Sequence, residues 1–459
     1  MSSAGPTVSR RAVVGGALGA LAAPAAARAA DLGVVAFTNV NVVPMDRDHV
    51  LNRQTVVVRD GFIAAVGSSV PVPAGARVVD GGGRAFLTPG LADLHVHSDT
   101  REDLAVYLAN GVTTVLNMGE ARNSFVGRTR PAVNRGDVPG PYVHVAFRLD
   151  GSPRYGSFVV TTADEARAAV RLARTNGFEF IKVYNTLSPE CFEAITDEAR
   201  RQGLAVVGHN VESMKPDRQM AAGQAMIAHA EEFLYAWFTP PPADQPTAAP
   251  PVSEIPAAVA AIRRYGTVVA ADLITYETIA AQWGKPDVAA AFLRSPLVRR
   301  LSPSHRMAWP NAGYDGRSGD LSLRVAFLRT FVKAMADAGV PLVSGTDAPT
   351  IPGVFPGASL HDNLSRLEAA GLSRYRALET ATRTPGEFLR RTVPGLPPMG
   401  QVAAGFRADL ILAEADPLRD LATLRRPLGV MAHGVWSSRE DLDRLVSGVE
   451  AKYASAATT

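Results

Sequence analysis

The segment LTPGLADLHVH, which runs from Leu87 to His97, places two imidazoles, His95 and His97, at alternate positions of a short apolar strand. Side chains at i and i+2 of a strand point to the same face of a sheet, so both rings can reach one metal ion. A His-x-His pair by itself is equally compatible with packing or surface histidines. The choice between these interpretations depends on the rest of the chain.

Four further side chains that can bind metal follow strand-like apolar runs. They are Lys182 after FEFI, His209 after LAVVG, His229 after MIA and Asp347 after PLVSGT. The ordered set His-x-His, Lys, His, His, Asp resembles the binuclear-metal amidohydrolase superfamily, and within it the imidazolonepropionase-like and Xaa-Pro-dipeptidase-like amidohydrolases. The resemblance covers nearly the whole chain after residue 31, and this ligand set is highly specific.

The resemblance implies two divalent metal ions bridged by Lys182 in its N6-carboxylated form. An unmodified lysine is a cation with hydrogen-bond donors only, but a neutral amine buried among apolar neighbours can add carbon dioxide and then offers two carbamate oxygens. The more buried ion would be held by His95, His97 and Asp347, and the outer ion by His209 and His229. These ligand types favour zinc and leave manganese, cobalt or iron as alternatives.

Strand-like and helix-like segments alternate from residue 88 to residue 390, which is the pattern of a parallel βαβ sheet. The expected strands are 91–96, 112–117, 142–147, 179–184, 204–208, 226–228, 267–272 and 341–345. Eight such strands predict an α/β fold, a (β/α)8 TIM barrel with insertions. An open doubly wound sheet is the alternative, but no Gly-x-Gly-x-x-Gly turn follows an early strand.

Short β segments flank this region at both ends of the chain. One set comprises residues 34–37, 55–58 and 62–67, with Arg59-Asp60-Gly61 as a hairpin turn, and a second set comprises residues 405–413 and 430–436. The pattern predicts the strands but not how they join. The family resemblance implies one small composite β-sandwich, formed by residues 31–87 and 391–450, beside a barrel formed by residues 88–390.

The first 30 residues resemble an export signal. Arg10-Arg11 precedes an Ala/Gly-rich apolar run, and Ala27-Arg28-Ala29 offers a small-residue cleavage site, as in a twin-arginine signal. Val13 stands where an aromatic residue is often found, which leaves a general secretion signal open. The apolar run is too short for a membrane-spanning helix. We therefore expect a periplasmic or secreted protein without an integral membrane segment.

The charge balance argues against a nucleic-acid partner. The whole chain has 47 basic and 44 acidic residues, and loss of the leader removes three arginines and no acid, which leaves the mature protein neutral. The single Cys191 cannot form an internal disulfide and is expected to be a packing residue. We expect a small-molecule substrate, and the sequence leaves the oligomeric state open, a homo-oligomer included.

Substrate contacts are expected in the loops that follow the barrel strands. The candidates are Tyr184, Asn210, Arg148, His144, Tyr235 and Trp237, each of which is equally compatible with packing. An arginine such as Arg148 is suited to a substrate carboxylate. The Pro-rich residues 239–251 predict an extended loop after the sixth strand, which is either a lid or a solvated surface excursion.

These residues predict a metal-dependent hydrolase, and the resemblance implies an amide-like C–N bond in a dipeptide, an N-acyl amino acid or a related small amide. It also implies that a hydroxide between the two ions attacks the carbonyl carbon, while Asp347 accepts the proton and passes it to the leaving group. A lactone or phosphotriester hydrolase is the alternative, because the same centre serves carbonyl and phosphoryl electrophiles. A catalytically silent binding module is disfavoured, since all six ligands are present.

Overall fold

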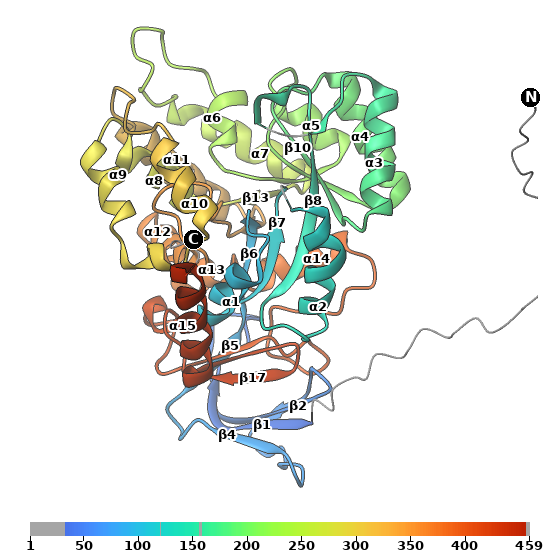
Figure 1. The fold of residues 1–459 in the computed structure, drawn as a ribbon, viewed down its shortest axis with the longest axis vertical. Helices are drawn as coiled ribbons and strands as arrows, with labels where there is room; N and C mark the ends of the chain where they lie inside the picture. Colours follow the sequence, from blue (N-terminus) through green and yellow to red (C-terminus); the bar gives the residue numbers. More distant parts are fainter. Residues whose placement is uncertain (1–32, 120, 156–157, 456–459) are drawn as a thin grey trace, which may run out of the picture.

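The computed structural model describes residues 33–119, 121–155 and 158–455, and it contains two sheets (Figure 1). The larger sheet and its helices form the upper part of Figure 1, and the smaller sheet lies below them. The expected export signal at residues 1–30 lies outside the described residues. Within the described ranges, no helix is long and apolar enough to cross a membrane.

The larger sheet contains eight parallel strands that follow one another around a barrel. They are β6 (Leu91–Val96), β7 (Val112–Asn117), β8 (Tyr142–Asp150), β10 (Phe180–Val183), β11 (Ala205–Gly208), β12 (Gln224–Ile227), β13 (Val268–Ala270) and β14 (Leu342–Val343). The last strand returns to the first: Leu94 N donates to Ser344 O at 3.0 Å, and Val96 forms a parallel bridge with Ala348. The predicted (β/α)8 barrel is confirmed, and the open doubly wound sheet is wrong because the two end strands meet.

Both faces of the barrel strands are buried in apolar surroundings. Ala146 and Phe180 point into the barrel, whereas their neighbours Val145 and Ile181 pack beneath the surrounding helices. Strands of this kind are continuous apolar runs rather than alternating ones. This property explains why every predicted strand overlaps an observed strand.

Helices cover the outside of the barrel. They are α1 (Arg101–Ala109), α3 (Ala163–Thr175), α4 (Pro189–Gln202), α5 (Pro216–Ala222), α7 (Ile255–Tyr265), α8 (Leu273–Gln282), α11 (Ser322–Asp337), α12 (Ala358–Ala369), α13 (Arg374–Glu379) and α14 (Arg383–Thr392). Local signals set their ends. Helix α4, for example, begins where the Ser188 hydroxyl accepts from Cys191 N and ends at Gly203 in the left-handed conformation. Cys191 itself is buried in the core, as a packing residue.

The smaller sheet joins the two ends of the chain. Its strands are β1 (Val34–Val42), β2 (Leu51–Arg59), β3 (Phe62–Gly67), β4 (Arg77–Asp80), β5 (Phe86–Pro89), β15 (Leu410–Ala413), β16 (Gly429–Ala432) and β17 (Val435–Ser438). Antiparallel pairing of β5 with β15 connects the two segments. The predicted hairpin between β2 and β3 turns at Asp60 and Gly61, which both have positive φ.

The segment from Leu87 to His97 passes from one sheet into the other. Strand β5 ends at Pro89 and β6 begins at Leu91, so only Gly90 separates them. A Cβ at residue 90 would lie 2.2 Å from the Thr113 hydroxyl oxygen, and glycine therefore permits this close approach. The direct connection fixes the start of β6, and with it His95 and His97, relative to the smaller sheet.

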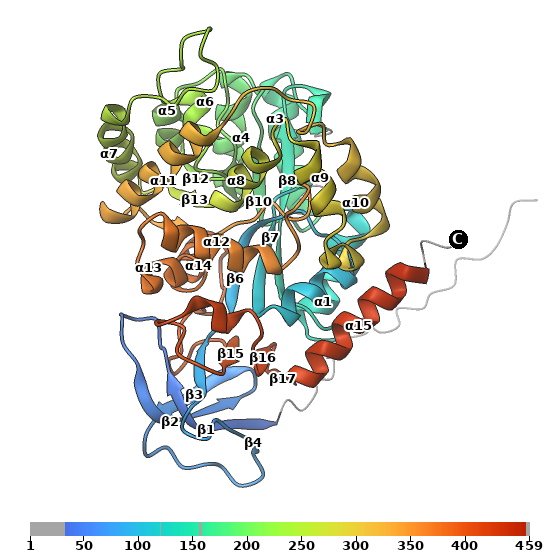
Figure 2. The same ribbon diagram turned by 90° about the vertical axis from the view of Figure 1, so that its left-hand side faces the viewer.

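The remaining elements are short or lie in long connections. They are η1 (Phe125–Thr129), α2 (Arg130–Asn134), η2 (Pro153–Tyr155), β9 (Phe158–Val159), α6 (Glu232–Ala236), η3 (Val252–Glu254), α9 (Pro286–Leu293), η4 (Pro296–Arg300), α10 (Pro303–Ala308), η5 (Trp309–Asn311) and η6 (Leu421–Leu424). The long C-terminal helix α15 (Arg439–Ser455) leaves the smaller sheet and packs along α1 of the barrel (Figure 2). The C-terminal segment is therefore not confined to the smaller sheet.

The Pro-rich residues 239–251 lie between α6 and η3 and contain neither helix nor strand, as the composition predicts. Arg324 of α11 donates hydrogen bonds to the carbonyl oxygens of Pro246 and Ala248. The loop is thus attached to a barrel helix, and its role as a lid stays a prediction.

Candidate metal centre

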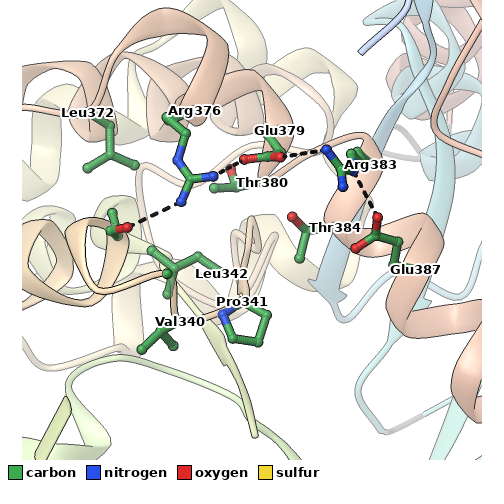
Figure 3. A pocket seen from close by; sticks show the side chains of 12 residues that line it. Val340, Pro341, Leu342, Leu372, Arg376, Glu379, Thr380, Arg383, Thr384 and Glu387 are labelled. Atoms are coloured by element: carbon green, nitrogen blue, oxygen red, sulfur yellow. Dashed lines mark hydrogen bonds and ion pairs between the residues drawn. The ribbon is translucent and has the colours of Figure 1, made fainter. Parts of the chain in front are cut away.

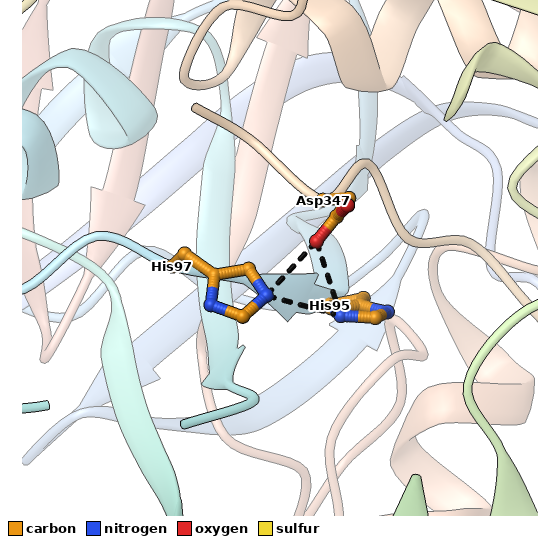
Figure 4. A group of neighbouring side chains, drawn as sticks. All are labelled: His95, His97 and Asp347. Atoms are coloured by element: carbon orange, nitrogen blue, oxygen red, sulfur yellow. Dashed lines mark hydrogen bonds and ion pairs between the residues drawn. The ribbon is translucent and has the colours of Figure 1, made fainter. Parts of the chain in front are cut away.

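Three predicted ligands from opposite ends of the barrel sequence meet at its carboxyl-terminal mouth (Figure 4). The Oδ1 atom of Asp347 lies 2.9 Å from Nε2 of His97 and 3.3 Å from Nε2 of His95, and the two Nε2 atoms are 3.3 Å apart. Two imidazoles and a carboxylate that converge in this way form a donor set that divalent zinc accepts. We call these three residues the inner group.

The backbone at the end of β6 turns both histidines to the inside. The pairing of β6 with β7 is irregular between Asp93 and Val96. As a result, Leu94 packs inside the barrel while Val96 packs under the helices. Gly345 in the neighbouring strand end allows a close approach, because a Cβ there would lie 2.7 Å from Cβ of His95.

Lys182 joins the inner group from β10. It is 1% exposed, and its Nζ atom lies 3.2 Å from Nε2 of His95. A lysine at this position is not a surface residue with a solvated head group, which removes the main alternative for its role. Burial of this kind makes a neutral amine accessible.

His209 and His229 lie beside the inner group. The ring centre of His229 is 4.3 Å from that of His95 and 5.1 Å from that of His209. All six predicted ligands thus lie together at the mouth of the barrel. We call His209 and His229 the outer pair.

A carboxylate stands behind each imidazole of the outer pair. Nδ1 of His209 is 2.6 Å from Oε1 of Glu232, and Nδ1 of His229 is 2.6 Å from Oδ2 of Asp272. Both acids are buried. Neither residue is among those predicted from the sequence. Asp272 ends the predicted seventh strand, so the rule that located the ligands, a polar residue at the end of a strand, also points to it.

The electrostatics of the site follow from burial and these pairings. Burial lowers the pKa of His209 to about 4, although Glu232 opposes the shift. At His229 the charges of Asp272 and Glu231 outweigh burial and raise the pKa to about 10. Burial opposes ionisation of Asp347, but His95 and the hydrogen bond from His97 hold its pKa well below the usual range. Asp347 is therefore ionised at neutral pH.

Three of the predicted substrate contacts lie close to the outer pair. The ring of Tyr184 is 4.1 Å from that of His209, and the guanidinium of Arg148 lies 5.5 Å from the centre of the Tyr184 ring. Arg148 on β8 is the register partner of Lys182 on the neighbouring parallel strand β10, so the two residues lie at the same level along the barrel. Asn210 is buried next to His209, and its side-chain amide has no hydrogen-bond partner among the described residues.

The other three candidates do not join the site. His144 lies four residues before Arg148 on β8, which places it about 13 Å deeper in the barrel. There its Nδ1 atom contacts Glu179 at 3.1 Å. Tyr235 is 59% exposed, and Trp237 packs against the core under the helices. The assignment of these three residues as substrate contacts stays a prediction.

A separate surface pocket of about 190 Å³ lies at the amino end of β14, on the far side of the barrel from the metal centre (Figure 3). Its two arginines, Arg376 and Arg383, face Glu379, and Arg383 also pairs with Glu387. Because these charges neutralise one another within the wall, the pocket offers no free charge to a ligand.

Comparison with known proteins agrees with the site. The family model described as "Amidohydrolase family" matches residues 86–437. Ochratoxinase from Aspergillus niger is 24% identical over 453 residues, which cover 85% of this chain and 83% of that protein. Imidazolonepropionase from Ralstonia nicotianae is 33% identical over 117 residues, which cover 25% of this chain and 21% of that protein.

Solved structures extend the comparison to the whole fold. The bottromycin amidohydrolase has a TM-score of 0.70 at 25% identity, covering 92% of this chain and 90% of that chain. A Xaa-Pro dipeptidase with bound methionine has a TM-score of 0.64 at 18% identity, covering 88% of this chain and all of the other, and supports the fold alone. Since the family model spans the barrel and reaches into both segments of the smaller sheet, the chain belongs to the amidohydrolase family and is a hydrolase that acts on carbon–nitrogen bonds.

Proposed function

We propose that this protein is a two-metal hydrolase that cleaves the amide C–N bond of a dipeptide, an N-acyl amino acid or a related small amide. The observation that carries the proposal is the convergence of the inner group and Lys182, with the outer pair beside them. Imidazole and carboxylate donors of this kind fit zinc, with manganese, cobalt and iron as the other candidates. Ions held there would lower the pKa of water towards neutrality and polarise the amide carbonyl.

Lys182 is proposed to act as a carbamate. Its amine nitrogen would form a bond to the carbon of carbon dioxide and release a proton, which converts a donor into a group with two acceptor oxygens. The position supports this role, because Nζ is buried and faces His95 on the side of the inner group. A carbamate at this point would reach both the inner group and the outer pair.

Asp347 is proposed to move the proton. Its lowered pKa keeps the carboxylate ionised at neutral pH, and its Oδ1 atom faces the inner histidines. It can therefore accept a proton from the attacking water and return it to the leaving nitrogen, which must be protonated before the C–N bond breaks.

The substrate class rests on Arg148 and Tyr184. The guanidinium of Arg148 is buried at the level of the ligands. Its Nη2 atom donates to the carbonyl oxygen of Tyr155, and its other N–H groups can donate to a substrate carboxylate. This favours substrates with a free carboxylate near the scissile amide, such as dipeptides and N-acyl amino acids. The Xaa-Pro dipeptidase among the similar structures has a name that agrees with this class.

The test combines metal analysis with a substrate panel. Elemental mass spectrometry of the purified protein should give close to two divalent ions per chain, and N-acyl amino acids or Xaa-Pro dipeptides should be hydrolysed. Turnover of lactones or a phosphotriester alone would replace the amide assignment by the alternative chemistry. Absence of metal after supplementation would refute the two-metal proposal.

We also propose export through the twin-arginine route, on the basis of Arg10 and Arg11 in the sequence. This route carries proteins that are already folded, which suits a centre assembled from distant segments. Conversion of both arginines to lysine should leave an active enzyme inside the cell, and unchanged export would refute this route.

A further inference from the structure

The two carboxylates behind the outer pair come from the next strand around the barrel in each case. His209 follows β11, and its partner Glu232 begins α6 after β12. His229 follows β12, and its partner Asp272 follows β13. Each contact therefore connects the end of one strand, which carries a histidine of the outer pair, to the segment that follows the next strand.

We propose that Glu232 and Asp272 are positioning residues that fix the orientation and tautomer of the outer pair, and so determine the affinity of the outer metal ion. The inference rests on the proposed function, because it assumes that the outer pair binds metal. The inference adds Glu232 and Asp272 to the metal centre, as residues that support the outer pair and not the inner group.

The tautomer follows from the chemistry of the contacts. A carboxylate only accepts hydrogen bonds, so the N–H of each outer imidazole lies on Nδ1, which faces the acid at 2.6 Å. In a neutral ring the other nitrogen, Nε2, then carries the lone pair that a metal requires. Loss of the acid would remove the preference for this tautomer and allow the imidazole ring to change its orientation.

The charge distribution gives the acids a second role. The inner group contains a carboxylate of its own, Asp347, and Nδ1 of His95 faces the carbonyl oxygen of Ala228 at 3.2 Å, with Oδ2 of Asp272 farther away at 3.9 Å. The outer pair contains no carboxylate of its own, and Glu232 and Asp272 place negative charge next to its two imidazoles. A carboxylate partner raises the basicity of a ligand histidine.

The two acids are held differently, which makes their variants informative. The second oxygen of Glu232 accepts from Asn210 N at 2.9 Å, so both of its oxygens are engaged. Asp272 Oδ1 has no hydrogen-bond partner among the described residues. Glu232→Gln must therefore set an NH2 group against one of two N–H donors, whereas Asp272→Asn can keep its acceptor towards His229 and lose only the charge. We expect the larger effect from Glu232→Gln.

Glu231 offers a matched control. It is 8% exposed, adjacent to Glu232 in the chain, and its Oε1 atom is 3.9 Å from Nδ1 of His229, beyond hydrogen-bond distance. Glu231→Gln replaces a buried carboxyl group at nearly the same place without removing a hydrogen bond to the outer pair. A larger effect of Glu232→Gln than of Glu231→Gln therefore reports the loss of the hydrogen bonds of Glu232, not merely the replacement of a buried glutamate beside the outer pair.

The experiment measures zinc bound per chain in the full-length protein during titration with a chelator. Wild type should retain two ions. Glu232→Gln should retain one ion at chelator concentrations where wild type keeps both, with the weaker site 10- to 100-fold lower in affinity, and Asp272→Asn should show a smaller loss at the same site. Glu231→Gln should show the smallest change of the three.

Retention of both ions with wild-type affinity by Glu232→Gln and Asp272→Asn would overturn the inference. A wild-type protein that binds no metal would instead refute the proposed function, so the two failures are distinguishable. If Glu232→Gln does not fold, ¹⁵N NMR of the histidines in metal-free wild type decides the matter. A proton on Nδ1 of both outer rings supports the inference, and an Nδ1 without a proton in either ring overturns it.

Discussion

The smallest change with a large expected effect is Gly345→Ala. A Cβ at residue 345 would lie 2.7 Å from Cβ of His95, whereas ordinary contact begins near 3.4 Å. The two strand ends would have to separate by about 0.7 Å, since Cβ of His95 moves only with its backbone. Metal–ligand distances tolerate changes of about 0.2 Å. The added methyl group therefore displaces a ligand by several times the permitted amount.

We expect Gly345→Ala to lose most of its inner metal and to lower the hydrolytic rate by about 100-fold, which is the usual result of a displacement approaching 1 Å in a catalytic site. Crowding of the barrel should also cost about 1–3 kcal/mol of unfolding free energy. Metal content, urea unfolding and turnover of the best amide substrate measure these effects. Gly448→Ala on α15, where a Cβ meets nothing within 4 Å, is the control. A Gly345→Ala protein with wild-type metal content and rate would refute the close-approach argument.

Three other changes test separate parts of the molecule. Lys182→Ala should lose the bridge and most of the metal, and a variant with full metal and rate would show that the ligand assignment is wrong. Burial raises the pKa of Asp103 from 3.8 to about 7. Between these two pH values the folded protein therefore binds more protons than the unfolded chain. The free energy of unfolding should fall by up to about 4 kcal/mol as the pH rises from 3.8 to 7. Asp103→Asn should flatten this slope in urea titrations at pH 4 and pH 8, and an unchanged slope would contradict the assignment. Arg407→Met leaves Asp409 buried without its charged partner and should cost about 3–5 kcal/mol in urea unfolding, whereas a neutral outcome would mean that the pair contributes no net stability.

The barrel strands and the predicted ligands could be found from the sequence because both depend on local pattern. A strand buried on both faces is an apolar run, and a polar residue directly after such a run stands at the mouth of the barrel. This rule identified Lys182, His209, His229 and Asp347, and the structure brings them together.

The remaining features depend on which strand ends meet in space. Glu232 lies three residues after His229 but contacts His209, a pairing that local sequence cannot indicate. His144 lies on barrel strand β8, but deeper in the barrel than the ligands, where it contacts Glu179. The sequence predicts where a strand lies in the chain more accurately than which of its residues stand at the mouth of the barrel. Tyr235 follows β12 on helix α6 and is 59% exposed, so its role as a substrate contact stays a prediction.

The pairing of β5 with β15 also constrains the order of events during synthesis. Pro89 and Leu410 are partners in the smaller sheet, yet about 320 residues separate them in the chain. The five strands at the beginning are made first, and β5 leaves the ribosome with one edge unpaired until nearly the whole barrel has followed. An exposed edge strand is a site for pairing with other chains. The growing polypeptide is therefore open to aggregation through this edge until β15 emerges and closes the smaller sheet.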